Sequence, residues 1–565
     1  MPKKYAISDE APAAVSEGLS GYPPVVQRLL FNRGIKNADE AALFLDCDYA
    51  QIHDPFLLKD AEKASSILLE AFLKNDRVLI WGDYDADGLA ASALLSDFFD
   101  QIGFRNYDVY LPDRNGDGFG LNEQGIKDAV SGGVKLIITV DCGSSDFKET
   151  VLAKELGLKI IITDHHEAPA RHPPADAFVN PKREDCPYPG KMICGTAVAF
   201  KIVCAVLKKN RFDMKEGAEK WLLDLVGIAT VSDMVPLIGE NRIFAKYGLL
   251  VLRKTRRFGL KALFRKLRMK SFNLAEDDIG FMIAPRLNAA SRMGQAGDAY
   301  RLLVTRDGAE ATELSEHLDH INNERKGLVA SMVRTAREKI MERENVREAI
   351  VAGHVSWKPS LLGLVASALA EHFKKPAFIW GDGGGVCLKG SCRSDGKVDV
   401  TRIMAEAKYV FEDYGGHKMS GGFSVDREKI HLLEDALCGA VLKFPEEAAD
   451  VSKMADMALR IEEVEPTLYS MIERLAPYGV GNPKPIFLLE DVSVSGAKMF
   501  GKDGTHLELA LVSGNSRVKA ISFFAGKGAA ERFTPGQKIS LAANLEKSTF
   551  RDYPEYRLRI VDILS

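Results

Sequence analysis

The sequence has no long apolar run and no close pair of cysteines. None of its uninterrupted apolar stretches approaches membrane-spanning length, and the first twelve residues, MPKKYAISDEAP, contain no apolar signal core. Its eight cysteines are scattered without a CxxC pair, which argues against a disulfide framework and against a structural zinc cage. We therefore expect a cytoplasmic protein with no membrane association and with reduced, mostly packed cysteines.

The sequence also lacks a strong net charge, internal repeats and low-complexity segments. Its net charge is −4, and 46% hydrophobic with 27% charged residues is ordinary globular composition. With 565 residues the chain is several times the length of one domain, so two to four domains are expected. The net charge says nothing about nucleic acid, because only local basic surfaces matter for that interaction.

Three short apolar runs each end in a carboxylate, and these endings are the most informative feature present. Residues 77–82 (RVLIWG) precede Asp83, Asp85 and Asp87, residues 135–140 (KLIITV) precede Asp141, and residues 159–163 (KIIIT) precede Asp164, His165 and His166. Runs of this kind are typical of buried parallel strands, whose carboxyl ends carry the chemistry of open α/β sheets. If the three strands are neighbours, these side chains converge. Crowded carboxylates repel one another unless cations neutralise them, so a metal site is predicted.

One segment is strongly basic. Residues 253–270 (RKTRRFGLKALFRKLRMK) contain nine Lys or Arg and no acidic residue, with Phe258 and Phe264 between them. The segment is either a solvated helix face whose apolar residues pack inward, or a ridge that binds phosphates without reading sequence. The sequence leaves both alternatives open.

The order of apolar patterns divides the chain into five blocks. Residues 1–75 are expected to form a helical segment supporting the core, 76–306 an α/β domain, 307–345 a connecting helix, and 346–445 a second α/β domain. Residues 451–565 contain five strand-like runs separated by turn residues: IFLLEDVSV, HLELALVS, RVKAISFF, KISLAANL and EYRLRIVDIL. Five such strands suit a small Greek-key barrel such as an OB-fold.

Several motifs resemble a known family. The motifs DYDADG (residues 83–88) and DHH (164–166) resemble the first and third signatures of the DHH phosphoesterases, and Asp141 in TVDCG and Asp233 in GIATVSDMVPLIGENR resemble the second and fourth. The blocks NPKREDCPYPGKMICGTAVAFK, APRLNAASRMG and PYGVGNPKPIF are similar to the RecJ exonucleases of that superfamily. KGSCRS and YGGHKMSGGF resemble the DHH-associated domain. The resemblance covers nearly the whole chain.

The resemblance implies a centre that holds two Mn²⁺ or Mg²⁺ ions. Hard divalent ions prefer carboxylate oxygens, and an imidazole ligand favours Mn²⁺. The expected ligands are Asp85, Asp87, Asp141, His165 and Asp233. His166 would face the scissile phosphate, Asp164 would orient a histidine, and Asp83 would either bind metal or shape its turn. As single residues these aspartates would be read as turn or cap residues, but their convergence favours the metal site.

The resemblance also implies a grip on a 5′ phosphate. Arg114 resembles the family's phosphate-binding arginine, and Ser391 and Arg393 resemble its partners from the second lobe. Backbone amides at Gly416 and His417, in the GGH loop, could approach the phosphate closely.

Other candidate contacts have an equally plausible structural role. Arg286 and Asn288 are candidate contacts to the DNA backbone, with a buried structural salt bridge as the alternative. Tyr478 and other aromatic residues of the last block either stack on bases or belong to a core.

Four positions depart from the family pattern. Residues 357–360 read Trp-Lys-Pro-Ser where the family commonly has Trp-His-Pro-Gly, and Ser291 and Cys392 replace usual glycines. Lys358 therefore stands where the family commonly has a histidine on the second lobe. Every expected metal ligand is nevertheless present.

Together these features predict an α/β protein with two α/β lobes, a parallel-sheet DHH domain and a DHH-associated domain, joined by a long helix and followed by an all-β OB-fold. The predicted activity is a 5′-to-3′ exonuclease specific for single-stranded DNA, releasing mononucleotides in recombination and repair. It would act as a monomer on strands with a 5′ phosphate, with a helicase and a single-strand-binding protein as possible partners. The alternatives are a DHH-family phosphodiesterase acting on short oligonucleotides or cyclic dinucleotides, and an inactive DNA-binding scaffold.

Overall fold

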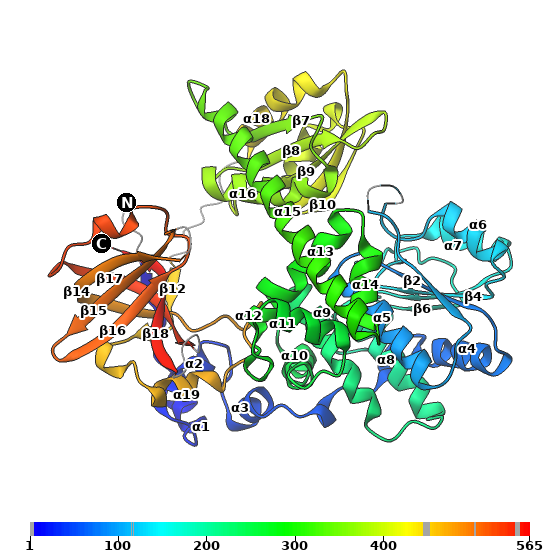
Figure 1. Cartoon of the computed structure of the whole chain (residues 1–565), viewed down its shortest axis with the longest axis horizontal. Helices are drawn as coiled ribbons and strands as arrows, with labels where there is room; N and C mark the ends of the chain where they lie inside the picture. Colours follow the sequence, from blue (N-terminus) through cyan, green and yellow to red (C-terminus); the bar gives the residue numbers. More distant parts are fainter. Residues whose placement is uncertain are drawn as a thin grey trace. The chain divides into compact units, whose positions relative to one another are not determined.

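The computed structural model describes residues 5–114, 116, 118–444, 453–501, 504–548 and 554–564. It divides into two units, one made of residues 53–233 and 247–449, the other of residues 1–52, 234–246 and 450–565 (Figure 1). The predicted domain limits at positions 1, 445, 451 and 565 lie outside the described residues. Over the described ranges, every helix is too short or too polar to span a membrane.

The first lobe is built on a five-stranded parallel sheet with the strand order β3-β2-β4-β5-β6. The strands are β2 (Val78–Gly82), β3 (Tyr107–Tyr110), β4 (Leu136–Val140), β5 (Lys159–Thr163) and β6 (Ala177–Val179). Residues of β2 and β4 are buried throughout, as the apolar runs predict for strands covered on both faces. The predicted parallel sheet is confirmed, and β2, β4 and β5 are direct neighbours.

Helices surround this sheet and continue beyond it. They are α4 (Ala61–Lys74), α5 (Ala86–Gln101), α6 (Glu123–Ser131), α7 (Phe147–Glu155), α8 (Gly195–Lys209), α9 (Leu223–Ser232), α10 (Gly239–Leu252), α11 (Phe258–Lys266), α12 (Glu276–Asp278), α13 (Ala284–Arg292) and α14 (Ala296–Val304). Helix α5 begins directly after Asp85, whose side chain accepts hydrogen bonds from the amides of Asp87 and Gly88. The first motif is therefore fixed at a helix start.

The predicted connecting helix is α15 (Gly308–Met341), a 34-residue helix capped by Asp307. Its first half packs on α11, α13 and α14. Its second half places Met332, Ala336 and Ile340 in the apolar core that includes the second lobe's helix α16 (Pro359–Phe373). One continuous helix thus contributes to the cores of both lobes (Figure 1).

The second lobe contains a five-stranded mixed sheet with the order β10-β11-β9-β8-β7. Its elements are β7 (Ile350–His354), β8 (Ala377–Asp382), β9 (Cys387–Arg393), β10 (Asp413–His417) and β11 (Ser420–Asp426), with α17 (Val400–Glu406) and α18 (Leu433–Lys443). Only β7 and β8 run parallel to each other among the pairs of this sheet. The GGH segment lies on the edge strand β10.

The C-terminal strands close into a barrel, as predicted for an OB-fold. They are β13 (Met457–Ala458), β14 (Phe487–Phe500), β15 (His506–Ser513), β16 (Ser516–Ser522), β17 (Lys538–Ser548) and β18 (Glu555–Ile563), with α19 (Pro466–Glu473) before β14. Strand β14 pairs with both β15 and β17, which closes the sheet on itself. Closure removes the open edges that an isolated sheet would expose.

The N-terminal segment shares its core with this barrel. Strand β1 (Tyr5–Ile7) pairs in parallel with β12 (Lys453–Ala455), and the Tyr5 hydroxyl donates to Asp562 at 2.7 Å. Helices α1 (Ala13–Gly18), α2 (Pro24–Phe31) and α3 (Ala38–Leu45) follow. Leu29 and Leu45 are buried in the same cluster as barrel residues such as Leu509. The two ends of the chain therefore complete one hydrophobic core.

Candidate metal centre and phosphate site

The strand ends of the first lobe bring carboxylates and histidines into one small volume. Three groups of side chains offer ligand atoms within 4.8 Å of one another. The groups are Asp83 with Asp85 and Asp141, Asp87 with His165 and Asp233, and Asp141 with His165 and His166. Asp141 and His165 each belong to two groups. Residues shared in this way would suit two divalent cations held close together.

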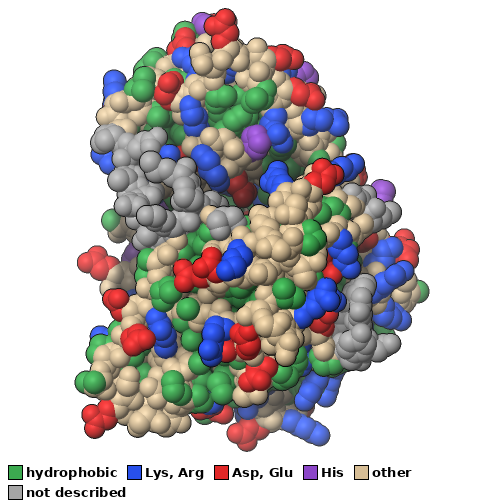
Figure 2. All heavy atoms as spheres, turned by 90° about the vertical axis from the view of Figure 1, so that its left-hand side faces the viewer, with side chains coloured by type: hydrophobic (Ala, Val, Ile, Leu, Met, Phe, Trp, Pro, Cys, Tyr) green, Lys and Arg blue, Asp and Glu red, His purple; other side chains and the backbone are tan. Residues whose placement is uncertain are grey.

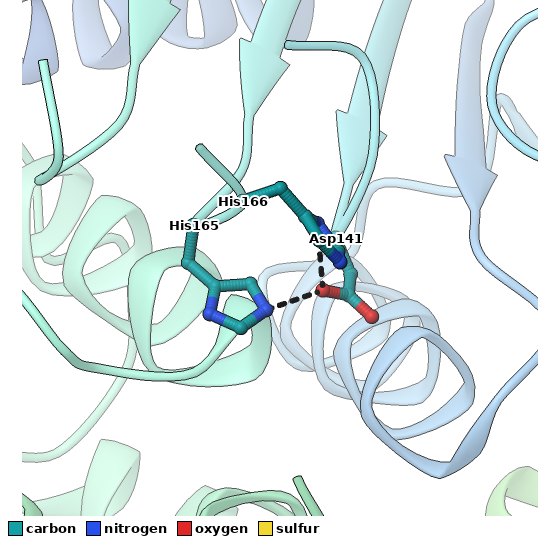
Figure 3. Close-up of side chains that lie close together, drawn as sticks. All are labelled: Asp141, His165 and His166. Atoms are coloured by element: carbon teal, nitrogen blue, oxygen red, sulfur yellow. Dashed lines mark ion pairs between the residues drawn. The ribbon is translucent and has the colours of Figure 1, made fainter. Parts of the chain in front are cut away.

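His165 lies at the middle of the cluster. Its Nε2 is 3.1 Å from Asp141 Oδ1, 3.7 Å from Asp233 Oδ2 and 3.8 Å from Asp87 Oδ2. Figure 3 shows both imidazoles approaching the same oxygen of Asp141, with His166 Nδ1 at 4.0 Å. The strand ends after β4 and β5 therefore supply side chains that meet at one atom.

Asp141 is held in a conformation that few residues adopt. Its φ of 63° lies in the left-handed region, where Asp and Asn are tolerated better than most residues. A Cβ at Gly195 would lie 2.5 Å from Asp141 Oδ1, so a glycine is needed beside the carboxylate. Asp141 Oδ1 and Asp83 Oδ1 are buried without a hydrogen-bond donor. Buried oxygens left in this state fit a bound cation.

Burial, together with repulsion among the carboxylates, raises the pKa values in the cluster. Burial, followed by the charge of Asp85, raises the pKa of Asp83 to about 8, and burial with the charge of Asp87 raises the pKa of Asp233 to about 8. The pKa values of Asp85 and Asp141 are raised for the same two reasons. In the absence of cations the cluster therefore holds protons that a bound metal ion would displace.

Asp87 makes contacts that the sequence did not predict. Its Oδ2 accepts from the Gly195 amide at 2.7 Å, and its Oδ1 accepts from the Thr196 amide and hydroxyl at 2.7 and 2.6 Å. Both oxygens thus bind the first turn of α8, where a carboxylate is favourable. Asp87 fixes α8, and with it Gly195, against the metal cluster.

Asp164 orients the DHH segment. Its Oδ1 accepts from the backbone amides of His165 and His166 and lies 2.8 Å from His166 Nδ1, while its Oδ2 accepts from the Ser144 amide. Burial opposes the charge on both side chains, but their hydrogen bond raises the pKa of His166 to about 9 and lowers that of Asp164. Asn180, from the NPKRED block, holds the same segment by donating to His166 O and Ser144 Oγ.

The predicted phosphate-binding residues lie on both lobes. Arg114 places its guanidinium carbon 4.8 Å from the ring centre of Tyr84, next to Asp83 in sequence. Arg393 Nη1 donates to Ser391 Oγ at 3.2 Å and to Cys392 O at 2.7 Å. A Cβ at Gly363 in α16 would lie 2.9 Å from Arg393 Nη2 and 3.2 Å from Ser391 Oγ. Helix α16 therefore lies directly against the side chains of Arg393 and Ser391 at this position.

Strand β10 presents the two remaining predicted contacts. Gly416 and His417 are exposed, and Gly416 has a φ of 146°. A Cβ at Gly416 would lie 2.4 Å from Ser420 O of the paired strand. Residue 416 must therefore be glycine for β10 to pair with β11 at this point.

Arg286 and Asn288 have internal partners, which favours the structural alternative for both. The guanidinium of the buried Arg286 pairs with Asp319 at 2.8 Å, and Asn288 Oδ1 accepts from the Ala86 amide at 2.8 Å. A functional candidate that sequence reasoning missed is Arg292, whose pKa falls to about 10 because of burial and the nearby charges of Arg114 and Arg325. The sequence signal that could have identified Arg292 is its position in the APRLNAASRMG block, which is similar to the family.

Among the residues that depart from the family pattern, Ser360 makes hydrogen bonds between two helices. The buried Ser360 donates its hydroxyl to Arg292 O at 2.7 Å, and Arg292 Nη1 donates to Ser360 O. Lys358 is exposed at the start of α16 and makes no side-chain cap. Ser291 is buried and bonds within its own helix, and the buried Cys392 Sγ lies 3.9 Å from Met404 Sδ.

The structure of the basic segment matches the first alternative, a helix whose apolar residues pack inward, and phosphate binding stays a prediction. Arg257 pairs with Asp97 and Asp224, and Arg253 donates to Leu274 O, so these two side chains are structural. On α11, Phe264 is buried, whereas Lys261 and Arg265 are exposed four residues apart on one helix face. On the face shown in Figure 2, Lys and Arg side chains are interspersed with Asp and Glu.

An aromatic cluster lies at one end of the barrel. Phe523 contacts His506 and Phe500 at 5.3 and 6.3 Å between ring centres, and the Arg559 guanidinium lies 5.5 Å from the Phe523 ring. The neighbouring Phe524 is 82% exposed. Tyr478 instead belongs to the core and donates its hydroxyl to Ile472 O. Phe523 and Phe524 are therefore exposed at the barrel surface, whereas Tyr478 is not.

Sequence models of three domain families match the chain in order. They are the DHH family N-terminal domain over residues 77–230, the DHHA1 domain over 345–443 and the RecJ OB domain over 455–562. These domains define a DHH-type protein with an appended OB-fold.

Similarity to named relatives extends along the whole chain. The single-stranded-DNA-specific exonuclease RecJ of Bacillus subtilis is 34% identical over 95% of this chain and 68% of its own length. The Haemophilus influenzae RecJ is 31% identical over 88% of this chain and 89% of its own. The crystal structure of Thermus thermophilus RecJ in complex with Mn²⁺ matches with a TM-score of 0.82 and 27% identity, covering all of this chain and 79% of that one. The chain belongs to the RecJ family.

Proposed function

We propose that the chain is an exonuclease that hydrolyses single-stranded DNA from its 5′ end and releases mononucleotides. The observation that carries this proposal is the cluster of buried carboxylates at the ends of β2, β4 and β5, in a chain of the RecJ family. Relatives of this chain are named single-stranded-DNA-specific exonucleases.

The residues fit divalent cations by their chemistry. The two buried aspartate oxygens without hydrogen-bond donors, on Asp83 and Asp141, need a positive partner. RecJ of Thermus thermophilus has been crystallised with Mn²⁺ and with Mg²⁺. We assign two Mn²⁺ or Mg²⁺ ions to Asp83, Asp85, Asp87, Asp141, His165 and Asp233. Asp85 and Asp87 each also accept hydrogen bonds from backbone amides, which orient their carboxylates.

The ions would activate water and offset the negative charge that develops on the phosphate during hydrolysis. The protein's own side chains would bind the phosphates of the substrate. His166, kept cationic by Asp164, faces the cluster from its exposed side and can hydrogen-bond a phosphate oxygen. In the metal-free protein the hydrogen bond to Asp164 outweighs burial and raises the pKa of His166 to about 9, which favours the protonated imidazole. Arg114, Ser391 and Arg393 would bind the terminal 5′ phosphate, so the scissile bond lies at a fixed distance from the held end.

End-labelled single strands test this function directly. With Mn²⁺, a strand labelled at its 5′ end should lose the label immediately as a mononucleotide, whereas a 3′ label should persist until digestion is nearly complete. A blunt duplex should resist digestion. Endonucleolytic fragments, or loss of the 3′ label first, would contradict the proposed activity.

Metal binding should depend steeply on pH. The folded-state pKa values of Asp83 and Asp233, about 8, exceed the ordinary aspartate value. Between that ordinary value and pH 8 the metal-free folded protein therefore binds more protons than the unfolded chain, and its stability falls as pH rises through this window. Cations must displace these protons, so affinity for Mn²⁺ should rise by up to about tenfold per pH unit for each proton displaced, until pH passes 8.

Thermal unfolding with and without Mn²⁺ measures this linkage. The increase in Tm caused by Mn²⁺ should be larger near pH 8 than near pH 6. An equal increase at both values would show that the carboxylates are not protonated in the metal-free protein.

The barrel should contribute affinity for longer strands. Replacing both Phe523 and Phe524 with Ala removes two stacking surfaces, each worth about 1 to 3 kcal/mol per base. We expect at least about tenfold weaker binding of a long single strand, with little change for an oligonucleotide too short to reach the barrel. The exposed Tyr409 of the second lobe, changed to Ala, is the matched control. Equal affinity of the double variant and the wild type would show that these rings do not contact the DNA.

The requirement for single strands implies partners. A helicase would supply the substrate from duplex DNA, and a single-strand-binding protein would keep it open. These partners, a monomeric state and a cytoplasmic location are part of the same proposal.

A further inference from the structure

Helix α13 links the metal centre to the second lobe. Two side chains four residues apart in this helix make the contacts, so both lie on the same helix face. Asn288 Oδ1 accepts from the amide of Ala86, between Asp85 and Asp87. Arg292, at the end of the helix, makes a reciprocal pair of hydrogen bonds with Ser360: Nη1 to Ser360 O at 2.6 Å, and Ser360 Oγ to Arg292 O at 2.7 Å.

The connection continues through the first turn of α16 to the phosphate-binding residues. Ser360 and Gly363 are three residues apart on α16, and Gly363 lies against both Arg393 and Ser391. Ser360 is 5% exposed, so its two hydrogen bonds are largely protected from competition by water. A short series of contacts therefore runs from the first carboxylate motif, through Arg292 and Ser360, to the residues proposed to hold the 5′ phosphate.

We propose that the Arg292–Ser360 pair is a positioning element that sets the span between the metal centre and the 5′-phosphate site, and thereby the length of the released product. This inference rests on the proposed function. The terminal phosphate and the next phosphate of a strand are separated by one nucleotide, so the two sites must keep that spacing for mononucleotides to be released. Neither Ser360 nor the reciprocal bonds need to touch DNA.

The two residues should contribute unequally. Ser360→Ala removes one neutral hydrogen bond and leaves the carbonyl acceptor, so kcat should fall about fivefold. Arg292→Met removes the guanidinium from the pair, and kcat should fall further, on the order of tenfold to several tens, because small displacements of reacting groups slow catalysis strongly. In both variants some dinucleotide should accompany the mononucleotide product. Ser131→Ala is the control, because that exposed hydroxyl donates to Lys127 O within α6 and neither residue belongs to this series of contacts.

The test uses the full-length protein with Mn²⁺ and a single strand carrying a labelled 5′ phosphate, and it measures the size of the first product together with kcat and KM. Longer first products from Ser360→Ala and Arg292→Met, with KM for 5′-phosphorylated ends nearly unchanged, support the positioning role. Only mononucleotide at the wild-type rate from both variants overturns it. Loss of the preference for 5′-phosphorylated over 5′-hydroxyl ends in Arg292→Met, with Ser360→Ala unaffected, also overturns it by making Arg292 a phosphate ligand.

Two further results separate failure of this inference from failure of the proposed function. If wild-type protein digests no single-stranded DNA, the proposed function falls and the inference falls with it. Thermal unfolding shows whether Arg292→Met is folded. If it is not, Ser360→Ala alone tests the positioning role, because this substitution removes only one hydroxyl group.

Discussion

Asp141→Asn should abolish nearly all hydrolysis while leaving the fold and single-strand binding intact. Asn fits the left-handed backbone at position 141 and the tight space beside Gly195, so the substitution removes charge without a change of shape. Asp141 is shared by two of the three ligand groups, so losing its charge weakens both proposed cation positions. Metal stabilisation of the transition state is worth several kcal/mol, and kcat should fall about a thousandfold or more.

Turnover with saturating Mn²⁺, alongside binding of a labelled single strand, measures this effect. Asp213→Asn is a suitable control because Asp213 is exposed in the same unit and belongs to none of the three ligand groups. Binding should be retained or slightly strengthened, since a negative charge has been removed from a site that faces phosphates. Near-wild-type turnover of Asp141→Asn would show that the cluster is not the catalytic centre.

Arg393→Ala should cause the second-largest loss, confined to substrates with a 5′ phosphate. Arg393 is held by Ser391 Oγ and Cys392 O, so its guanidinium is pre-organised. Burial, together with the charge of Arg114, lowers its pKa, so a nearby anion would be favourable. A hydrogen bond between charged groups is worth about 1.5 to 3 kcal/mol, so kcat/KM for phosphorylated ends should fall on the order of a hundredfold.

The comparison that matters is between matched 5′-phosphorylated and 5′-hydroxyl strands. Arg114→Ala should behave similarly, whereas Arg427→Ala, which removes an exposed arginine paired with Asp382 in the same lobe, should not. An equal loss on both kinds of end would mean that Arg393 stabilises the lobe and does not read the phosphate.

The parts of the site that were predictable depend on local patterns. Short apolar runs indicate buried strands, and carboxylates that directly follow three neighbouring parallel strands must converge. The glycine-rich GGH segment and the capping of α5 by Asp85 follow from equally local rules. For this reason the amino-acid sequence alone predicts that Asp83, Asp141 and His165 lie together.

The contacts that were not predictable join residues far apart in sequence. Asp87 meets Thr196 and Arg286 meets Asp319, but nothing in the sequence of either helix selects its partner. A charged side chain beside a phosphate site and one in a buried ion pair have the same sequence signature. The apolar face of α2 likewise indicates that the helix is packed, but not that it packs with the barrel.

The shared core of the two chain ends has a consequence for synthesis in the cell. Helices α1 to α3 leave the ribosome first, yet the partners of Leu29 and Leu45 include barrel residues made more than 400 positions later, and Tyr5 bonds Asp562. The emerging N-terminus must keep its apolar faces from aggregating until translation is almost finished. A premature stop near the end of the message would therefore leave the beginning of the protein unfolded, and quality-control proteases would be expected to attack it there first.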